Sequence, residues 1–119
     1  MRRHDFKKLK VWQLSKDLTV EIYKLTYNFP QVEKFGLTSQ IRWATLSISA
    51  NIAEGMSRIT EKDKARFINQ AFSSAIEVVN FLILANDLEF LSTEDYLNLR
   101  EKIEKITNQL NSLYKKFDK

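Results

Sequence analysis

Several residue types are absent from this 119-residue chain or rare in it, and each shortage excludes a class of protein. There is no cysteine, which excludes disulfides, thiolate metal sites and a cysteine nucleophile and favours a cytoplasmic location. No uninterrupted apolar run approaches the roughly 18 residues of a membrane span, and the N-terminus lacks the apolar core of a signal peptide. We therefore expect a soluble protein with no membrane partner.

Glycine and proline are also scarce, with two glycines and one proline in the whole chain. Sheets and loop-rich folds use both residues in their turns, so the shortage favours long helices with few, short connections. The length fits one domain, residues 1–119, with one hydrophobic core. We expect an all-α fold.

Four segments have the apolar spacing of one helix face, and they are predicted to be helices over about residues 9–28, 38–54, 61–88 and 93–117. In the first, apolar residues recur at steps of three and four from Val11 to Phe29, and Pro30 stops the helix. In the last, a heptad seam runs from Tyr96 to Phe117. Short links between long helices make neighbours antiparallel, so we predict an up-down-up-down four-helix bundle.

Local signals mark some of the helix ends. Thr38 or Ser39 is the expected N-cap of the second helix, and Thr60 and Ser92 are the expected caps of the third and fourth. Gly55 is predicted to end the second helix in a left-handed conformation, which costs glycine least.

The third helix is apolar over more of its circumference than one core requires. It carries two apolar seams, and Ile76 and Ile83 extend them. Such a helix is either the most central one of a monomer or has a second contact surface. The pattern favours a homo-oligomer.

The net charge of +4 is concentrated at the N-terminus, because residues 1–10 hold five basic residues and one acidic residue. Residues 1–8 are expected to be a basic tail before the first helix. A smaller basic cluster, Lys115, Lys116 and Lys119, closes the chain. Charged tails are commonly solvated without a partner, and the functional alternative is attraction to phosphate. The candidate nucleic-acid contacts are Arg2, Arg3, Lys7, Lys8 and Lys10, with Arg42 and Arg58 as secondary contacts.

Residues that could carry chemistry are few, so we expect no enzymatic activity, no metal and no cofactor. His4 is the only histidine, and a charged tail positions it poorly for catalysis or metal binding. Bundles hold di-iron sites through Glu-x-x-His pairs, and none is present. Two isolated glycines cannot form a phosphate-binding loop.

A polar stripe borders the apolar face of the second helix. Its members, with a charged residue of the third helix, form a candidate network of Gln40, Arg42, Ser47, Asn51, Glu54 and Glu77. We interpret it as a partly buried network that fixes helix register, with Arg42 paired to Glu54 or Glu77 of a neighbouring helix or subunit. The alternative is a polar lining for a ligand or RNA.

Five aromatic residues could stack on bases, although such residues more often fill cores or interfaces: Trp12, Tyr23, Tyr27, Trp43 and Tyr96. Trp43 follows Arg42 and is the best aromatic candidate for a contact with a partner.

Three stretches carry a family resemblance. Residues 29–55 read FPQVEKFGLTSQIRWATLSISANIAEG, residues 6–18 read FKKLKVWQLSKDL, and residues 73–78 read SSAIEV. With their Phe-Pro, Phe-Gly-Leu, Ser-Gln-Ile-Arg and Asn-Ile-Ala-Glu-Gly elements in order, they resemble the four helix bundle proteins encoded in intervening sequences of bacterial 23S rRNA genes, also called S23 ribosomal proteins. Two departures are visible: Trp43 stands where the family commonly has a second basic residue, and Ser49 stands where proline is frequent.

The resemblance has implications for assembly and function. The family is similar to the accessory variability proteins of diversity-generating retroelements, which form homopentamers of four-helix subunits and bind nucleic acid and reverse transcriptase. It therefore implies a pentameric ring and a non-enzymatic, nucleic-acid-binding (RNA or nucleoprotein) or chaperone-like function. The alternative is a helical adaptor that binds protein and has no nucleic-acid role.

Overall fold

A computed structural model describes residues 5–118 as a set of helices, with no strand in that range. The elements are two short 3₁₀ helices, η1 (Phe6–Lys8) and η2 (Gln31–Glu33), and four α-helices, α1 (Lys10–Thr26), α2 (Leu37–Met56), α3 (Glu61–Asp87) and α4 (Thr93–Phe117). The prediction of an all-helical chain with four long helices is confirmed. The four ranges expected from the sequence differ from these bounds by two residues at most.

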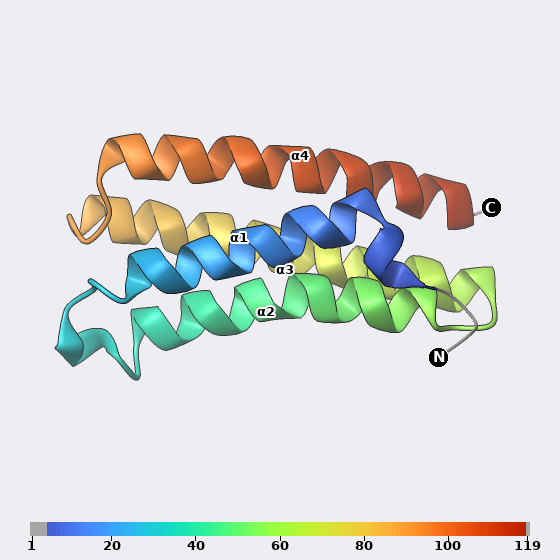
Figure 1. Ribbon diagram of the computed structural model, residues 1–119, viewed down its shortest axis with the longest axis horizontal. Coiled ribbons are helices and arrows are strands. Elements are labelled where there is room, and N and C mark those ends of the chain that lie inside the picture. The colour runs from blue at the N-terminus through green and yellow to red at the C-terminus, as the bar shows by residue number, and fades with distance from the viewer. Residues whose placement is uncertain (1–4, 119) are drawn as a thin grey trace.

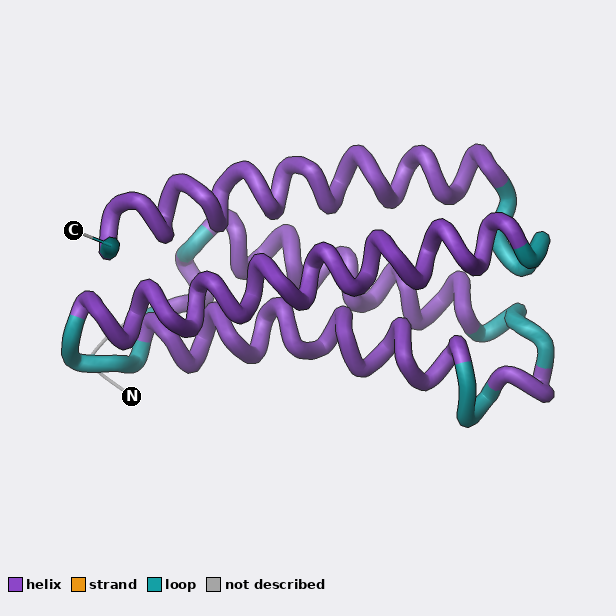
Figure 2. Tube along the Cα trace, turned by 180° about the vertical axis from the view of Figure 1, so that it is seen from behind, coloured by secondary structure: helices purple, strands orange, loops and turns teal. Residues whose placement is uncertain are grey.

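The four α-helices lie side by side along the long axis of a 43 × 24 × 20 Å molecule, and consecutive helices run in alternating directions (Figure 1). Each α-helix is in backbone contact with two others: α1 with α2, α2 with α3, α3 with α4, and α4 with α1. The diagonal pairs, α1 with α3 and α2 with α4, are not in backbone contact. Figure 2 shows short connections at both ends and the longest one, which contains η2, between α1 and α2.

Each α-helix contributes apolar side chains to one continuous core. The seam predicted for the last helix is confirmed, since Leu99, Ile103, Ile106 and Leu110 are buried. α1 contributes Val11, Leu18 and Ile22, and α2 contributes Ile41, Ile48 and Ile52. Half of the core side chains that α3 contributes are small, namely Ala71, Ala75 and Ala85, so its neighbours can approach closely.

Two of the expected N-caps are confirmed, and one is wrong. The hydroxyl of Thr60 accepts from the backbone N–H of Asp63, and that of Ser92 accepts from the N–H of Asp95. α2 begins one residue before Thr38, and Glu33 supplies its cap instead: the carboxylate accepts from the N–H of Leu37 at 3.1 Å. A carboxylate at the N-terminus of a helix also interacts favourably with the helix dipole.

The prediction that Gly55 ends the second helix in a left-handed conformation is wrong. Gly55 lies inside α2, and no glycine in residues 5–118 has a positive φ. A Cβ there would lie 2.9 Å from Cβ of Phe67 and 3.4 Å from the carbonyl oxygen of Lys64. Glycine is therefore required because α2 and α3 approach each other closely. The left-handed conformation belongs to Glu89, which follows α3 with φ 65°.

α3 is long and apolar enough to span a membrane when only length and composition are considered. The core helix of a soluble protein passes the same test, and α3 packs against both α2 and α4.

Replacing Gly55 by alanine tests the close approach of α2 and α3. Inside a helix, Gly→Ala alone would raise stability by about 1 kcal/mol. Because the new methyl meets Phe67, we expect Gly55→Ala instead to lower the free energy of unfolding by about 1–3 kcal/mol. Urea denaturation followed by circular dichroism measures the change. Ala50→Gly, at an exposed position of α2, is the control that measures the effect of helix propensity by itself. A Gly55→Ala protein that is more stable than the parent would contradict the packing argument.

Candidate functional site

The N-terminal lysines lie on an ordered helical turn rather than on a loose tail. Lys7 and Lys8 belong to η1 and Lys10 begins α1, and all three side chains are exposed. Asp5 accepts from the N–H of Lys7, and the Phe6 ring packs edge-on against Trp12 with centroids 5.2 Å apart. Met1, Arg2, Arg3 and His4 of the expected tail lie outside the described residues, as does Lys119 of the C-terminal cluster.

Three basic segments meet at one end of the molecule. η1, the α2–α3 turn and the C-terminal end of α4 lie together in both views (Figures 1 and 2). The basic residues on or next to these segments are Lys7, Lys8, Lys10, Arg58, Lys115 and Lys116, and we call this region the basic end. The two clusters, which are separate in the sequence, thus lie at the same end of the molecule.

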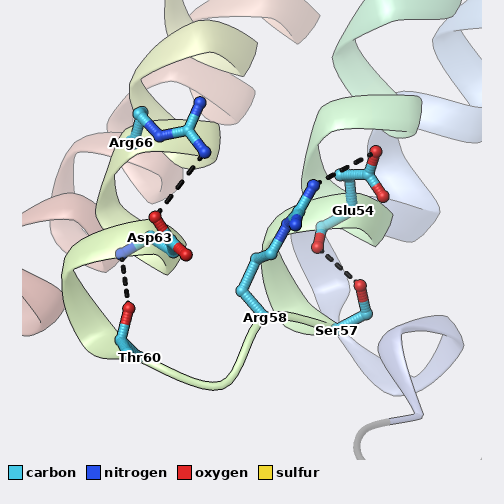
Figure 3. Close-up of polar contacts among 6 residues, drawn as sticks. All are labelled: Glu54, Ser57, Arg58, Thr60, Asp63 and Arg66. Carbon is cyan, nitrogen blue, oxygen red and sulfur yellow. Dashed lines mark hydrogen bonds and ion pairs between the residues drawn. The ribbon is translucent and has the colours of Figure 1, made fainter.

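The α2–α3 turn is held by a dense set of polar contacts (Figure 3). Arg58 forms an ion pair with Glu54 at 3.7 Å, and Arg66 forms one with Asp63 at 3.6 Å. Ser57 donates to the carbonyl of Glu54 at 2.7 Å. These ion pairs are partly exposed and therefore weak, so they leave the arginines able to exchange partners.

Phe67 lies between the two arginines of this turn. The guanidinium of Arg58 is 4.4 Å from its ring centroid and that of Arg66 is 4.5 Å away. Lys64 donates to the carbonyls of Met56 and Arg58, which satisfies acceptors at the end of α2. Among the described residues, Nε of Arg58 is the buried side-chain nitrogen without a hydrogen-bond partner. Cation–π attraction thus holds Arg58 at the basic end.

Arg42 lies at the opposite end of α2, about 20 Å or more from Arg58 by the helical rise of about 1.5 Å per residue. Its Nε donates to the Thr26 hydroxyl at 2.9 Å, and one Nη donates to the Tyr23 carbonyl at 3.2 Å. Its guanidinium also lies 4.5 Å from the Tyr23 ring centroid. Within one chain, the expected pairing of Arg42 with Glu54 or Glu77 is therefore wrong; across two subunits it stays a prediction.

The polar stripe does not form the expected network within one chain. Gln40, Glu54 and Glu77 are exposed, while Ser47 and Asn51 are half-buried. The Ser47 hydroxyl donates to the carbonyl of Trp43, and the Asn51 amide donates to the carbonyl of Ser47. Both side chains therefore bond to the backbone of their own helix. Side chains of this type satisfy themselves on the backbone one turn earlier, which removes the need for a partner helix.

The aromatic residues divide into two groups. Trp12 and Tyr96 are half-buried against the core, whereas Tyr23 is 37% exposed and Tyr27 and Trp43 are largely exposed. Phe35, which sequence reasoning missed, is the most exposed aromatic side chain of the described chain, at 89%. The sequence feature that could have identified Phe35 is its position in the α1–α2 connection, outside any apolar repeat.

α3 presents a partly exposed apolar stripe in addition to its core face. Ile76 and Ile83 are 49% and 40% exposed, and Phe72 and Val79 beside them are half-buried. The four residues are spaced by four, three and four positions, as in a helix–helix contact seam. We call them the α3 stripe.

Groups that could hold a metal do not converge in residues 5–118: no three histidine, aspartate or glutamate side chains lie together there. The expectations of no metal, no cofactor and no enzymatic activity stay predictions.

Comparison with known proteins gives a family and a structural neighbour. The 23S rRNA-intervening sequence protein family matches residues 7–112. A crystal structure of a protein of unknown function from the S23 ribosomal protein family of Bacteroides thetaiotaomicron has 28% sequence identity and a TM-score of 0.80. The similarity covers 88% of this chain and 98% of that one. No curated protein matches the chain.

Arg42 is expected to contribute to stability through its two fixed hydrogen bonds. Arg42→Ala should lower the free energy of unfolding by about 2 kcal/mol, and Arg42→Lys should recover only part of it, because an ammonium cannot replace the planar fork. Chemical denaturation measures both variants. Arg100→Ala, on the exposed face of α4, is the control and should change stability by less than about 0.5 kcal/mol. Equal stability of the Arg42 and Arg100 variants would show that the contacts contribute nothing.

Proposed function

This chain belongs to the 23S rRNA-intervening sequence protein family, and from that premise we propose that it is a non-enzymatic, oligomeric nucleic-acid-binding or chaperone-like protein of the cytoplasm. Its subunit is an up-down-up-down four-helix bundle that assembles into a ring, a pentamer by analogy with the accessory variability proteins. The ligand is RNA or a nucleoprotein. The neighbour is described as a protein of unknown function, so the argument rests on the surfaces of this chain.

The basic end is the observation that carries the proposal. Its lysines on η1 and α4 are exposed, and Lys7, Lys8 and Lys10 form no ion pair within residues 5–118. Exposed, uncompensated cations exchange counterions for phosphate, which is the main source of affinity for nucleic acid. The rigid α2–α3 turn adds Arg58 without a large cost in conformational entropy.

Assembly into a ring would strengthen this surface. Each subunit contributes one basic end, and linked weak contacts gain from effective concentration. The α3 stripe supports assembly, since its apolar side chains would be removed from water by a neighbouring helix.

The α3 stripe also supports a second candidate, a helical adaptor that binds another protein. Capture of partners from lysate with and without RNase separates the two functions. A partner that remains after RNase treatment favours the adaptor, and a partner lost with the RNA favours nucleic-acid binding.

Substitution of Lys7 and Lys8 tests the basic end. We choose substitution over deletion of residues 1–8, because deletion would remove Phe6 from Trp12. Lys7→Gln with Lys8→Gln should weaken binding to labelled rRNA fragments and reduce the slope of log affinity against log salt by about 0.7 for each lost phosphate contact. Fluorescence anisotropy across a salt series measures both quantities.

The control for this experiment removes the same charge from the exposed face of α4, by Arg100→Gln with Lys105→Gln. Its salt slope should stay that of the parent. If both double variants lose affinity equally, binding responds to net charge alone and the basic end is not the site.

The oligomer is tested at the α3 stripe. Ile76→Glu places a carboxylate in the proposed contact, so the mass measured by light scattering after size exclusion should fall towards the 14.0 kDa of one chain. Gln70→Glu, at an exposed position on another side of α3, should leave the mass unchanged. A parent protein that is already monomeric at tens of micromolar would end the ring proposal.

A further inference from the structure

All exposed aromatic side chains of residues 5–118 line one region, which is formed by the C-terminal half of α1, the connection that contains η2 and the N-terminal half of α2. Figure 1 shows these segments side by side. The exposed rings are Tyr23, Tyr27, Phe35 and Trp43. Scattered exposed apolar residues are normal on a protein surface, but a contiguous group of rings marks a surface used for binding.

Three adjoining shallow depressions contain these rings, and Arg42 lines all three. Lys24 and Lys34 line them as well, and none of the residues that line them is acidic. The carboxylate of Glu33, which is close in the chain, is engaged as the cap of α2. The region, which we call the Arg42 patch, therefore combines exposed rings with an excess of positive charge.

Arg42 is fixed in place before any ligand arrives. Thr26 and Tyr23 take two of its five N–H donors and the Tyr23 ring supports its plane, so three donors remain for a ligand. Tyr23 and Tyr27 are one helical turn apart, which puts their Cβ atoms about 5–6 Å from each other on the same side of α1. A prearranged guanidinium between rings loses little entropy when it binds an anion.

We propose that the Arg42 patch binds single-stranded nucleic acid, with bases stacked on Tyr27, Phe35 and Trp43 and phosphates against Arg42, Lys24 and Lys34. Aromatic platforms combined with cations are how proteins hold single strands irrespective of sequence. In a duplex the bases are already stacked and their faces are closed to side chains. The inference rests on the proposed function, because it takes nucleic acid as the ligand, but it uses the end of the molecule opposite the basic end.

A symmetric contact between two Arg42 patches is disfavoured. It would bring Lys24, Lys34 and Arg42 against their own copies, and like charges facing each other in an interface cost several kcal/mol. A ring contact, in contrast, sets one face of the subunit against a different face, and that occupant is an outcome of the test below. The rings and cations of the patch match a partner that is anionic and has flat apolar groups, and nucleotides have both properties.

Trp43 provides the reporter for a test. In a Trp12→Phe protein it is the only tryptophan, and stacking of a base should quench its fluorescence. The ligands are single-stranded oligouridine, an abasic strand with the same number of phosphates, and a duplex of the same length. We expect quenching by oligouridine and little by the other two.

Affinity provides the second readout, measured with labelled oligouridine by anisotropy in the full chain. Trp43→Ala and Tyr27→Ala should each weaken binding about tenfold, and duplex binding should stay unchanged. Leu97→Ala is the matched control, because Leu97 is an exposed apolar residue of α4, which does not contact α2. It should leave oligouridine affinity unchanged.

The outcomes distinguish this inference from the proposed function. If anisotropy shows binding that Lys7→Gln with Lys8→Gln weakens, while Trp43 fluorescence is unchanged, the patch is not the site and the proposed function stands. If the abasic strand quenches as strongly as oligouridine, stacking is refuted. If no oligonucleotide binds, both fail. If Trp43→Ala lowers the mass of the oligomer and no ligand quenches Trp43, a second copy covers the patch and the inference is overturned.

Discussion

The close approach of α2 and α3 at Gly55 is the constraint on which the arrangement of the basic end depends. With no side chain at Gly55, the α2 backbone lies directly against Phe67, and small core residues of α3 continue the contact. Phe67 is then placed between the guanidinium groups of Arg58 and Arg66. The turn that joins the helices is thereby fixed, and Lys64 closes it by binding two carbonyls at the end of α2. A wider separation of these helices would lose the ring contacts and with them the position of Arg58.

The long, narrow shape of the molecule separates two surfaces of different chemistry. The basic end offers exposed lysines on η1 and α4, and its rings, such as Phe6 and Phe67, are at least partly buried. The Arg42 patch offers exposed rings with a fixed arginine. Lysine is a strongly hydrated point charge that gains from many weak contacts, whereas a fixed guanidinium between aromatic rings favours a defined geometry. In the function that we propose, the two ends would have different roles, electrostatic attraction of the ligand at the basic end and ordered stacking at the Arg42 patch.

Between these ends, the α3 stripe is the surface best suited to a helix of another protein or subunit. Its spacing is that of a packing seam, and its residues are only half exposed, so a partner would complete a contact that the core has begun. In the ring that we propose, a contact along the helix sides would leave both ends free for a ligand.

The patterns that were predicted well are those that depend on nearby residues. The seam of α4 and the caps Thr60 and Ser92 repeat at short intervals, so the sequence contains the whole signal. Glu33 was missed as the cap of α2 because its place beside Leu37 requires the turn of η2. Arg42 was given the wrong partners in the chain because hydrogen bonds to Thr26 and Tyr23 require α1 to lie against α2.

The sequence by itself determined the helical class, the four segments, most of the core and the local excess of positive charge, because these follow from composition and from periods of three to seven residues. Only the tertiary structure decided what glycine does at position 55, which exposed rings lie together, and which cations are neighbours. Each of these depends on the axial register in which two helices distant in sequence pack, and no local sequence pattern specifies that register. The basic end joins residues near both termini, and the Arg42 patch joins α1, η2 and α2, so both surfaces exist only once the helices have packed.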